Sequence, residues 1–178
     1  MEFHIKTAPT PDNYHKNGCD FCETAWRCFG VREGKLIVDG NMQWLPIPTV
    51  VNAAFSCEMN LKAILLLEGK TPPKGANGHN LERLFLGIDE ETQEMISRFC
   101  MPKDTIDHKN AFLHILQIHR DDFREVRYFI EKSEWQDMSP FTMLTIAENL
   151  STITGALIER KSTGENDKIS DPVARTIQ

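Results

Sequence analysis

The segment from Val50 to Leu67 is apolar on most of its faces, yet it contains a glutamate and a lysine one helical turn apart. On a helical wheel of about 3.6 residues per turn, Glu58 falls at the centre of an apolar stripe and Lys62 follows one turn later. A helix that is apolar on most sides is enclosed by other elements, so these charges are expected to be buried. Because an isolated charge in a protein interior is costly, Glu58 needs a partner.

The composition of the chain is that of a soluble globular protein. Of its 178 residues, 40% are hydrophobic and 26% are charged. No uninterrupted apolar run is long enough to span a membrane, and the first residues lack the basic and then apolar order of a signal peptide. We therefore expect a cytoplasmic protein with no membrane role. The formal net charge of -6 argues against binding of duplex DNA and suits a protein partner better than extended nucleic acid.

Helical periodicity and helix-capping residues predict that most of the chain is helical. Thr10 and Ser139 each precede a proline, which is the pattern of a capping residue followed by a first-turn proline. Gly30 stops the first of these helices. Helices are predicted over residues 10–29, 46–67, 79–88, 89–100, 107–132 and 140–161.

A short insertion interrupts this helical pattern near residues 35–45, where Asp39-Gly40 between apolar runs is typical of a β-hairpin turn. The predicted fold is all-α, an antiparallel up-and-down helical bundle of about four long helices plus short helices and this hairpin-like insertion. It forms one domain over residues 1–161. A polar C-terminal tail without periodicity follows over residues 162–178.

The five cysteines read as free thiols in a reducing compartment, because an odd number without an export signal does not suit a disulfide framework. His15 stands one helical turn before Cys19, and Cys22 completes a single CxxC pair. These nitrogen and sulfur ligands have a spacing that suits zinc. The second CxxC or paired histidine of a structural zinc site is missing, so packed cysteines are the favoured interpretation over a metal site.

Four segments occur in an order that resembles the HEPN domain family: AAFSCEMNLKAILLLEGK, GHNLERLF, HRDDFREVRYFIE and a capped final helix that ends in ALIERK. The resemblance covers residues 10–161. It implies an all-helical bundle that pairs into a two-fold homodimer. It also implies a role in RNA cleavage, nucleotide-linked defence or toxin–antitoxin systems of prokaryotic type. The implied partners are a nucleotidyltransferase-like or antitoxin protein, a nucleotide or single-stranded RNA.

Ribonuclease members of this family carry an arginine that is followed a few residues later by a histidine. No arginine of this chain has a histidine at that distance, and every arginine from Arg120 onward follows the last histidine, His119. Metal-independent cleavage needs a base near the attacking hydroxyl and a cation at the developing phosphorane charge. We therefore expect a non-catalytic or degenerate binding and assembly module without a cofactor, rather than an enzyme.

The alternative is a metal-independent ribonuclease with a displaced site. Its candidate catalytic residues are His119, Arg120 and Arg124, with His114 nearby. Adjacent residues on a helix point about 100° apart and do not easily serve one phosphate, so the helix geometry counts against this site. An apolar-face histidine such as His119 is more often a core or interface residue.

The residues that match the family motifs form the candidate binding site. Arg127 lies on the shoulder of an apolar stripe and Glu131 follows one turn later. Either Arg127 or Lys62 is expected to pair with the buried Glu58.

His79 and Asn80 open a helix, where a cap and turn is favoured over a catalytic imidazole. Apolar side chains beyond what one helix face needs predict a homodimer surface, and these are Trp26, Leu67, Ile115 and Phe129.

Overall fold

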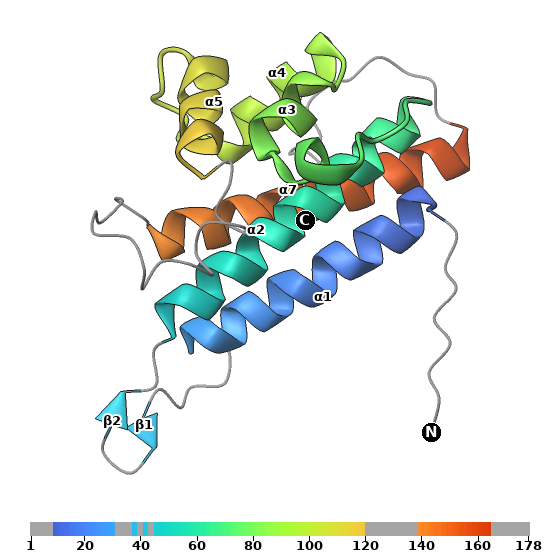
Figure 1. Cartoon of the computed structure of the whole chain (residues 1–178). Helices are drawn as coiled ribbons and strands as arrows, with labels where there is room; N and C mark the ends of the chain where they lie inside the picture. Colours follow the sequence, from blue (N-terminus) through green and yellow to red (C-terminus); the bar gives the residue numbers. More distant parts are fainter. Residues whose placement is uncertain (1–8, 31–36, 39–40, 43–44, 120–138, 165–178) are drawn as a thin grey trace, which may run out of the picture.

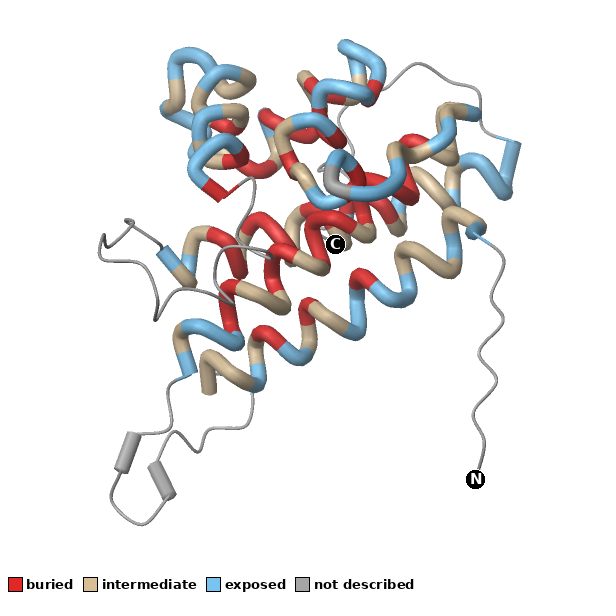
Figure 2. The backbone as a smooth tube through the Cα atoms, viewed as in Figure 1, coloured by how far each residue is buried: buried red, intermediate tan, exposed pale blue. Residues whose placement is uncertain are grey.

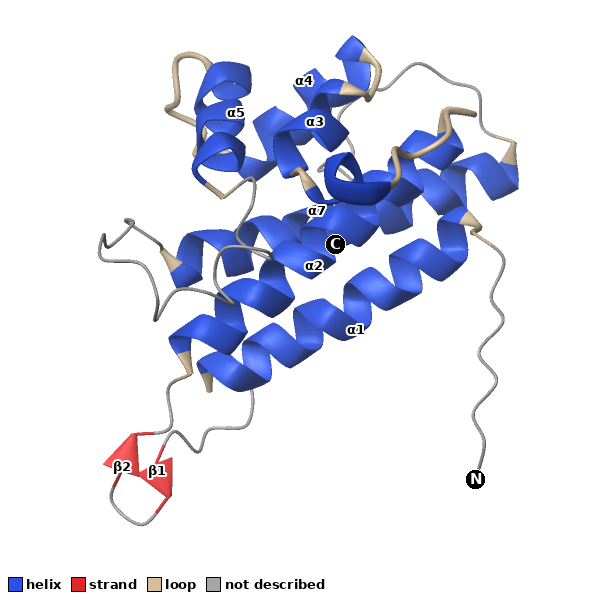
Figure 3. Cartoon of the chain, in the orientation of Figure 1, coloured by secondary structure: helices blue, strands red, loops and turns tan. Residues whose placement is uncertain are grey.

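The computed structural model describes residues 9–30, 37–38, 41–42, 45–119 and 139–164, and this part of the chain is mostly helical (Figure 3), as the all-α prediction requires. Two short strands, β1 (Ile37–Val38) and β2 (Asn41–Met42), pair antiparallel within the predicted insertion, with Ile37 opposite Met42. The helices are α1 (Pro11–Phe29), α2 (Pro46–Leu67), the 3-10 helix η1 (Gly75–His79), α3 (Leu81–Leu86), α4 (Glu90–Cys100), α5 (His108–Ile118) and α7 (Pro140–Thr163).

Within the described residues, the three long helices α1, α2 and α7 lie side by side, and α3, α4 and α5 pack across one side of them (Figure 1). Helices α2 and α7 run parallel to each other, because Lys161 near the end of α7 donates a hydrogen bond to the carbonyl of Leu67 at the end of α2. Helix α1 runs the opposite way: its last residue, Phe29, contacts Phe141 in the first turn of α7. The central helix α2 therefore touches both of its long neighbours.

Capping side chains fix the starts of the helices. Thr10 accepts a hydrogen bond from the backbone N–H of Asn13 at the start of α1, and Ser139 does the same for Thr142 at the start of α7. These contacts satisfy N–H groups that have no partner within the helix. Gly30 ends α1 with a φ of 80°, a left-handed conformation that glycine adopts without steric cost.

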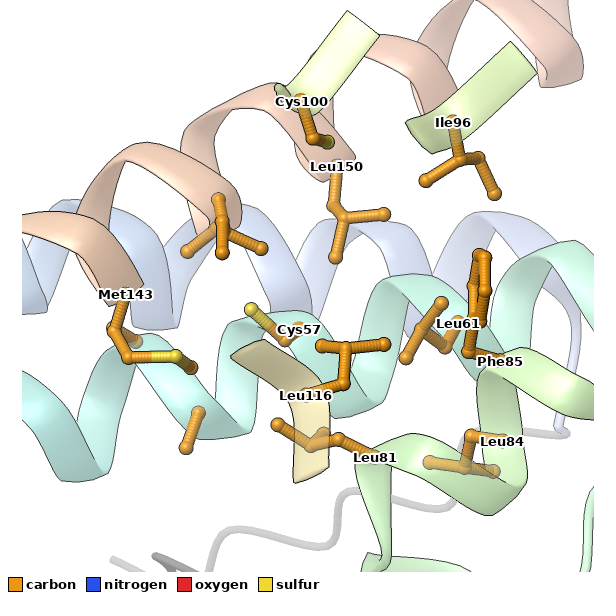
Figure 4. Close-up of a cluster of buried hydrophobic side chains, with 14 of the residues drawn as sticks. Cys57, Leu61, Leu81, Leu84, Phe85, Ile96, Cys100, Leu116, Met143 and Leu150 are labelled. Atoms are coloured by element: carbon orange, nitrogen blue, oxygen red, sulfur yellow. The ribbon is translucent and has the colours of Figure 1, made fainter. Parts of the chain in front are cut away.

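The hydrophobic core centres on α2, which is buried along most of its length (Figure 2). Figure 4 shows Leu61 of α2 close to Phe85 of α3, with Leu150 of α7 and Ile96 of α4 nearby. The rings of Phe85 and Phe112 meet edge to face, so α5 also joins this core. Both α2 and α7 are long and apolar enough to cross a membrane, but 67% of the apolar window of α2 is buried inside the protein. A core helix of a soluble protein has the same property.

The helix predicted over residues 107–132 is wrong in its extent. Helix α5 ends at Ile118, and His119 is its C-terminal cap with a φ of -98° and a ψ of 10°. The apolar periodicity continues in the sequence beyond this point, but periodicity does not report where the backbone leaves the helix. Residues 120–138 lie outside the described part of the chain.

Candidate functional site

Glu58 lies in the middle of α2, is only 2% exposed, and uses both of its carboxylate oxygens. Lys62 donates a hydrogen bond from Nζ to Oε1 over 2.6 Å, one helical turn along α2. The second oxygen, Oε2, lies 3.0 Å from Nδ1 of His79. Lys62 is therefore the partner that Glu58 needs, which was one of the two predicted pairings. The other candidate, Arg127, lies outside the described residues.

A compact loop carries His79 back over α2. After Gly69 the chain passes through two prolines into η1, which ends at His79. Gly78 is buried, and a Cβ atom there would lie 2.6 Å from the backbone oxygen of Pro73 and 3.8 Å from Nζ of Lys62. No side chain fits at this position. The glycine lets the loop close directly over the ammonium group of Lys62.

The hydrogen bond to Glu58 fixes which ring nitrogen of His79 carries a proton. An ionised carboxylate only accepts hydrogen bonds, so Nδ1 of His79 is the donor. The imidazole is held in one orientation by a buried acceptor, as in sites where a carboxylate orients a histidine. Its side chain is nevertheless 45% exposed. The imidazole is thus held by the buried Glu58 on one side and is accessible to solvent on the other.

Asn80 and Arg83 extend this arrangement on the surface. Asn80 caps α3 by accepting a hydrogen bond from the backbone N–H of Arg83, so its predicted capping role is correct. The exposed guanidinium of Arg83 donates from Nη1 to Oδ1 of Asn77 over 2.7 Å, which places it beside the loop that carries His79. Sequence reasoning missed Arg83 as a site residue. The signal was its position one turn after His79.

The charge of this cluster favours an anion. Glu58 neutralises Lys62 in the interior, so the exposed groups are the imidazole of His79 and the cation of Arg83. Arginine presents a fork of N–H donors that matches carboxylate and phosphate oxygens. The geometry therefore suits recognition of a phosphate or carboxylate group at the surface, with Glu58 as an orienting residue beneath it.

The displaced ribonuclease site is not assembled within the described residues. His119 is 3% exposed, whereas His114 on α5 is exposed. A general base must reach the hydroxyl that it deprotonates, and burial denies His119 this access. The other two catalytic candidates, Arg120 and Arg124, lie outside the described residues, and so do the predicted binding residues Arg127 and Glu131.

The three zinc candidates on α1 do not converge. Cys19 lies 3.6 Å from Nε2 of His15, but Cys22 is buried in the core with Ala25. Among the residues that the structure describes, no group of three histidine, cysteine or acidic side chains is arranged to hold a metal ion. Cys22 belongs to the packing of α1, the interpretation that the sequence favoured.

Comparisons of the chain with protein-family models, with curated proteins and with solved structures found no match.

Proposed function

We propose that this chain is a HEPN-like, non-catalytic binding and assembly module that recognises the phosphate of a nucleotide or of single-stranded RNA. The observation that carries the proposal is the Glu58–His79 contact, which holds a half-exposed imidazole on the loop to which Arg83 is bonded through Asn77. The motif order of the sequence supports the family. The proposal includes an antiparallel bundle of about four long helices that forms a homodimer in the cytoplasm.

The contacts favour binding over cleavage. The carboxylate of Glu58 is already bonded to Lys62 and to His79, so it serves to hold these two side chains in place and not to move protons in a reaction. A surface imidazole and a guanidinium supply hydrogen-bond donors and positive charge to a phosphate. The partner of the assembled module is a nucleotidyltransferase-like or antitoxin protein, in line with the acidic net charge of -6.

The test is the binding of a nucleoside triphosphate and of a short single-stranded RNA to the full-length protein, measured by calorimetry at low ionic strength. Because hydrogen bonds to charged groups contribute about 1.5 to 3 kcal/mol, Arg83→Ala should weaken binding roughly tenfold or more. The matched control is Arg98→Ala, since Arg98 is an exposed arginine on α4. Binding of neither ligand, or equal affinities of the wild-type protein and Arg83→Ala, would contradict the proposal.

The alternative function, a metal-independent ribonuclease with a displaced site, needs a separate assay. Single-stranded RNA is incubated with the protein in the presence of a chelator, beside the His119→Ala and His79→Ala variants. Because His119 is buried, we expect no cleavage by any of the three proteins. Cleavage that disappears in His119→Ala would replace the binding module with the ribonuclease.

A further inference from the structure

A polar cluster lies where α1, α2 and α7 meet, away from the Glu58 site. Asn60 of α2 is fully buried, and its Nδ2 donates to the carbonyl of Ser56 over 2.9 Å, to the hydroxyl of Ser56 over 3.5 Å and to the hydroxyl of Ser151 on α7 over 3.0 Å. Its Oδ1 lies 2.9 Å from Nδ1 of His15 on α1. Cys19, one turn further along α1, has its Sγ atom 3.6 Å from Nε2 of the same imidazole.

The bonds of Asn60 determine the proton position on His15. Since Nδ2 of Asn60 donates to Ser56 and Ser151, it is the carbonyl oxygen Oδ1 that faces His15. That oxygen only accepts, so Nδ1 of His15 carries the hydrogen. The other nitrogen, Nε2, then carries no hydrogen, and the Cys19 sulfur lies 3.6 Å from it and 3.8 Å from Nδ1. A cysteine, a histidine and an asparagine are thus arranged in series, with the thiol at the exposed end.

Two glycines make room for this cluster and hold it in place. A Cβ atom at position 155 on α7 would lie 3.2 Å from Nε2 of His15, and one at position 18 would lie 2.5 Å from Nδ2 of Asn60. The backbones of α1 and α7 therefore approach the imidazole and the amide closely. The imidazole sits against α7 in one orientation instead of sampling rotamers in solvent.

We propose that Cys19 is a site of reversible S-thiolation by low-molecular-weight disulfides, with His15 as the base that takes up the thiol proton. In this step the proton of the Cys19 thiol moves to Nε2 of His15, and the thiolate attacks one sulfur of the disulfide. A new S–S bond forms to Cys19 as the original S–S bond breaks. The leaving thiolate receives the proton from His15, so that protein thiol and disulfide become mixed disulfide and free thiol.

The other cysteines of α1 provide a comparison within the same helix. Cys22 is buried, whereas Cys28 is half-buried and its pKa is raised by burial. Burial also raises the pKa of Cys19, while a hydrogen bond with Ser151 lowers it and the charge of Asp20 raises it. Thiols with raised pKa values react slowly unless a base removes the proton. The imidazole beside Cys19 supplies that base.

The test is the rate of mixed-disulfide formation by the full-length protein with oxidised glutathione at neutral pH. Intact-mass spectrometry follows the reaction, and peptide fragmentation assigns the modified cysteine. Cys19 should react at least about tenfold faster than Cys28. His15→Ala should bring the rate at Cys19 down to that of Cys28. The matched control on the exposed face of α1 is Asn17→Ala, which should leave both rates unchanged.

A second variant keeps the test valid if His15→Ala fails to fold. Gly155→Ala retains the imidazole but places a methyl group 3.2 Å from the position of its Nε2 atom, so the ring must shift by a few tenths of an ångström. This variant should also slow modification of Cys19. Equal rates at Cys19 and Cys28 in the wild-type protein would overturn the proposal. An unchanged Cys19 rate in Gly155→Ala, or in a folded His15→Ala variant, would do so as well.

Discussion

The two carboxylate oxygens of Glu58 bind different groups, and this division sets the result of removing any one of the three residues. Lys62 is nearly buried, and among the described residues its charge is paired with Glu58. His79 is half-exposed and is able to gain contact with water. Loss of Glu58 therefore leaves a buried cation. Loss of His79 leaves an acceptor that retains its bond to Lys62.

For this reason Glu58→Ala should destabilise the protein by about 3 to 5 kcal/mol. The measurement is chemical denaturation followed by circular dichroism. Glu58→Ala combined with Lys62→Met removes both charges and should recover part of this loss, because no uncompensated ammonium group remains. Wild-type stability in Glu58→Ala would show that the Glu58–Lys62 pair does not stabilise the fold.

The pairing of Glu58 with Lys62 was predictable, whereas its contact with His79 was not. Residues 58 and 62 are one turn apart on a single helix, so helical geometry alone brings their side chains together. His79 reaches Glu58 across a loop whose path depends on the close contact between Gly78 and Pro73. The contact of His15 with Asn60 was missed for a similar reason, because it joins two helices.

At the scale of elements, the predicted helix boundaries were correct where a capping side chain marks the start of the helix. Helices α1 and α7 begin at the predicted capping residues Thr10 and Ser139, because a cap is a local contact that a few consecutive residues specify. Helix α5 stops at Ile118 although the apolar pattern of the sequence continues. Asp107 caps the start of α5, and its carboxyl loses its charge when it is protonated at acidic pH.

Asp107 accepts hydrogen bonds from the backbone and side-chain N–H groups of Asn110, and these bonds lower the pKa of its carboxyl below the ordinary value of 3.8. A lowered folded-state pKa means that the ionised cap stabilises the fold above the unfolded-state pKa. This contribution is lost as pH falls through the folded-state value. Denaturation across acidic pH should therefore show a stability difference between the wild-type protein and Asp107→Asn that changes below about pH 4. A constant difference throughout the range would rule out this cap.

The loop between α2 and α3 should tolerate no side chain at Gly78. Gly78→Ala places a methyl group against the Pro73 backbone oxygen, so the loop must shift and His79 with it. We expect a loss of about 1 to 3 kcal/mol in stability, together with weaker phosphate binding. Denaturation and calorimetry on the same variant measure both effects. Unchanged stability would mean that the loop adjusts freely.

At the scale of the whole molecule, the exposed apolar side chains differ from those expected. Trp26 and Ile115 are half-buried against the core, and Leu67 is also half-buried, whereas Phe129 lies outside the described residues. The large exposed apolar side chains among the described residues include Ile47 near the start of α2 and Phe141, 57% exposed, near the start of α7. Because these helices run parallel, both residues lie toward the same end of the long helices.

The homodimer remains a prediction, and we expect this end to contribute to it. Light scattering of the full-length protein at micromolar concentration should give twice the monomer mass. Phe141→Ser should shift the equilibrium toward the monomer, since it removes exposed apolar area from the interface. Thr152→Ala, on an exposed part of α7, is the control that should leave the mass unchanged. A monomer in the wild-type protein would remove the dimer from the proposed function.

The close approach of the three long helices at Asn60 also constrains how relatives of this chain can diverge. A Cβ atom at position 18 meets the Asn60 amide at 2.5 Å, and one at position 155 meets the His15 ring at 3.2 Å. A larger residue at position 18 or 155 would therefore meet the side chain of Asn60 or His15 too closely. A smaller residue at position 60 or 15 would leave room for it. Among homologous sequences, the four positions should therefore covary as a set and not drift independently.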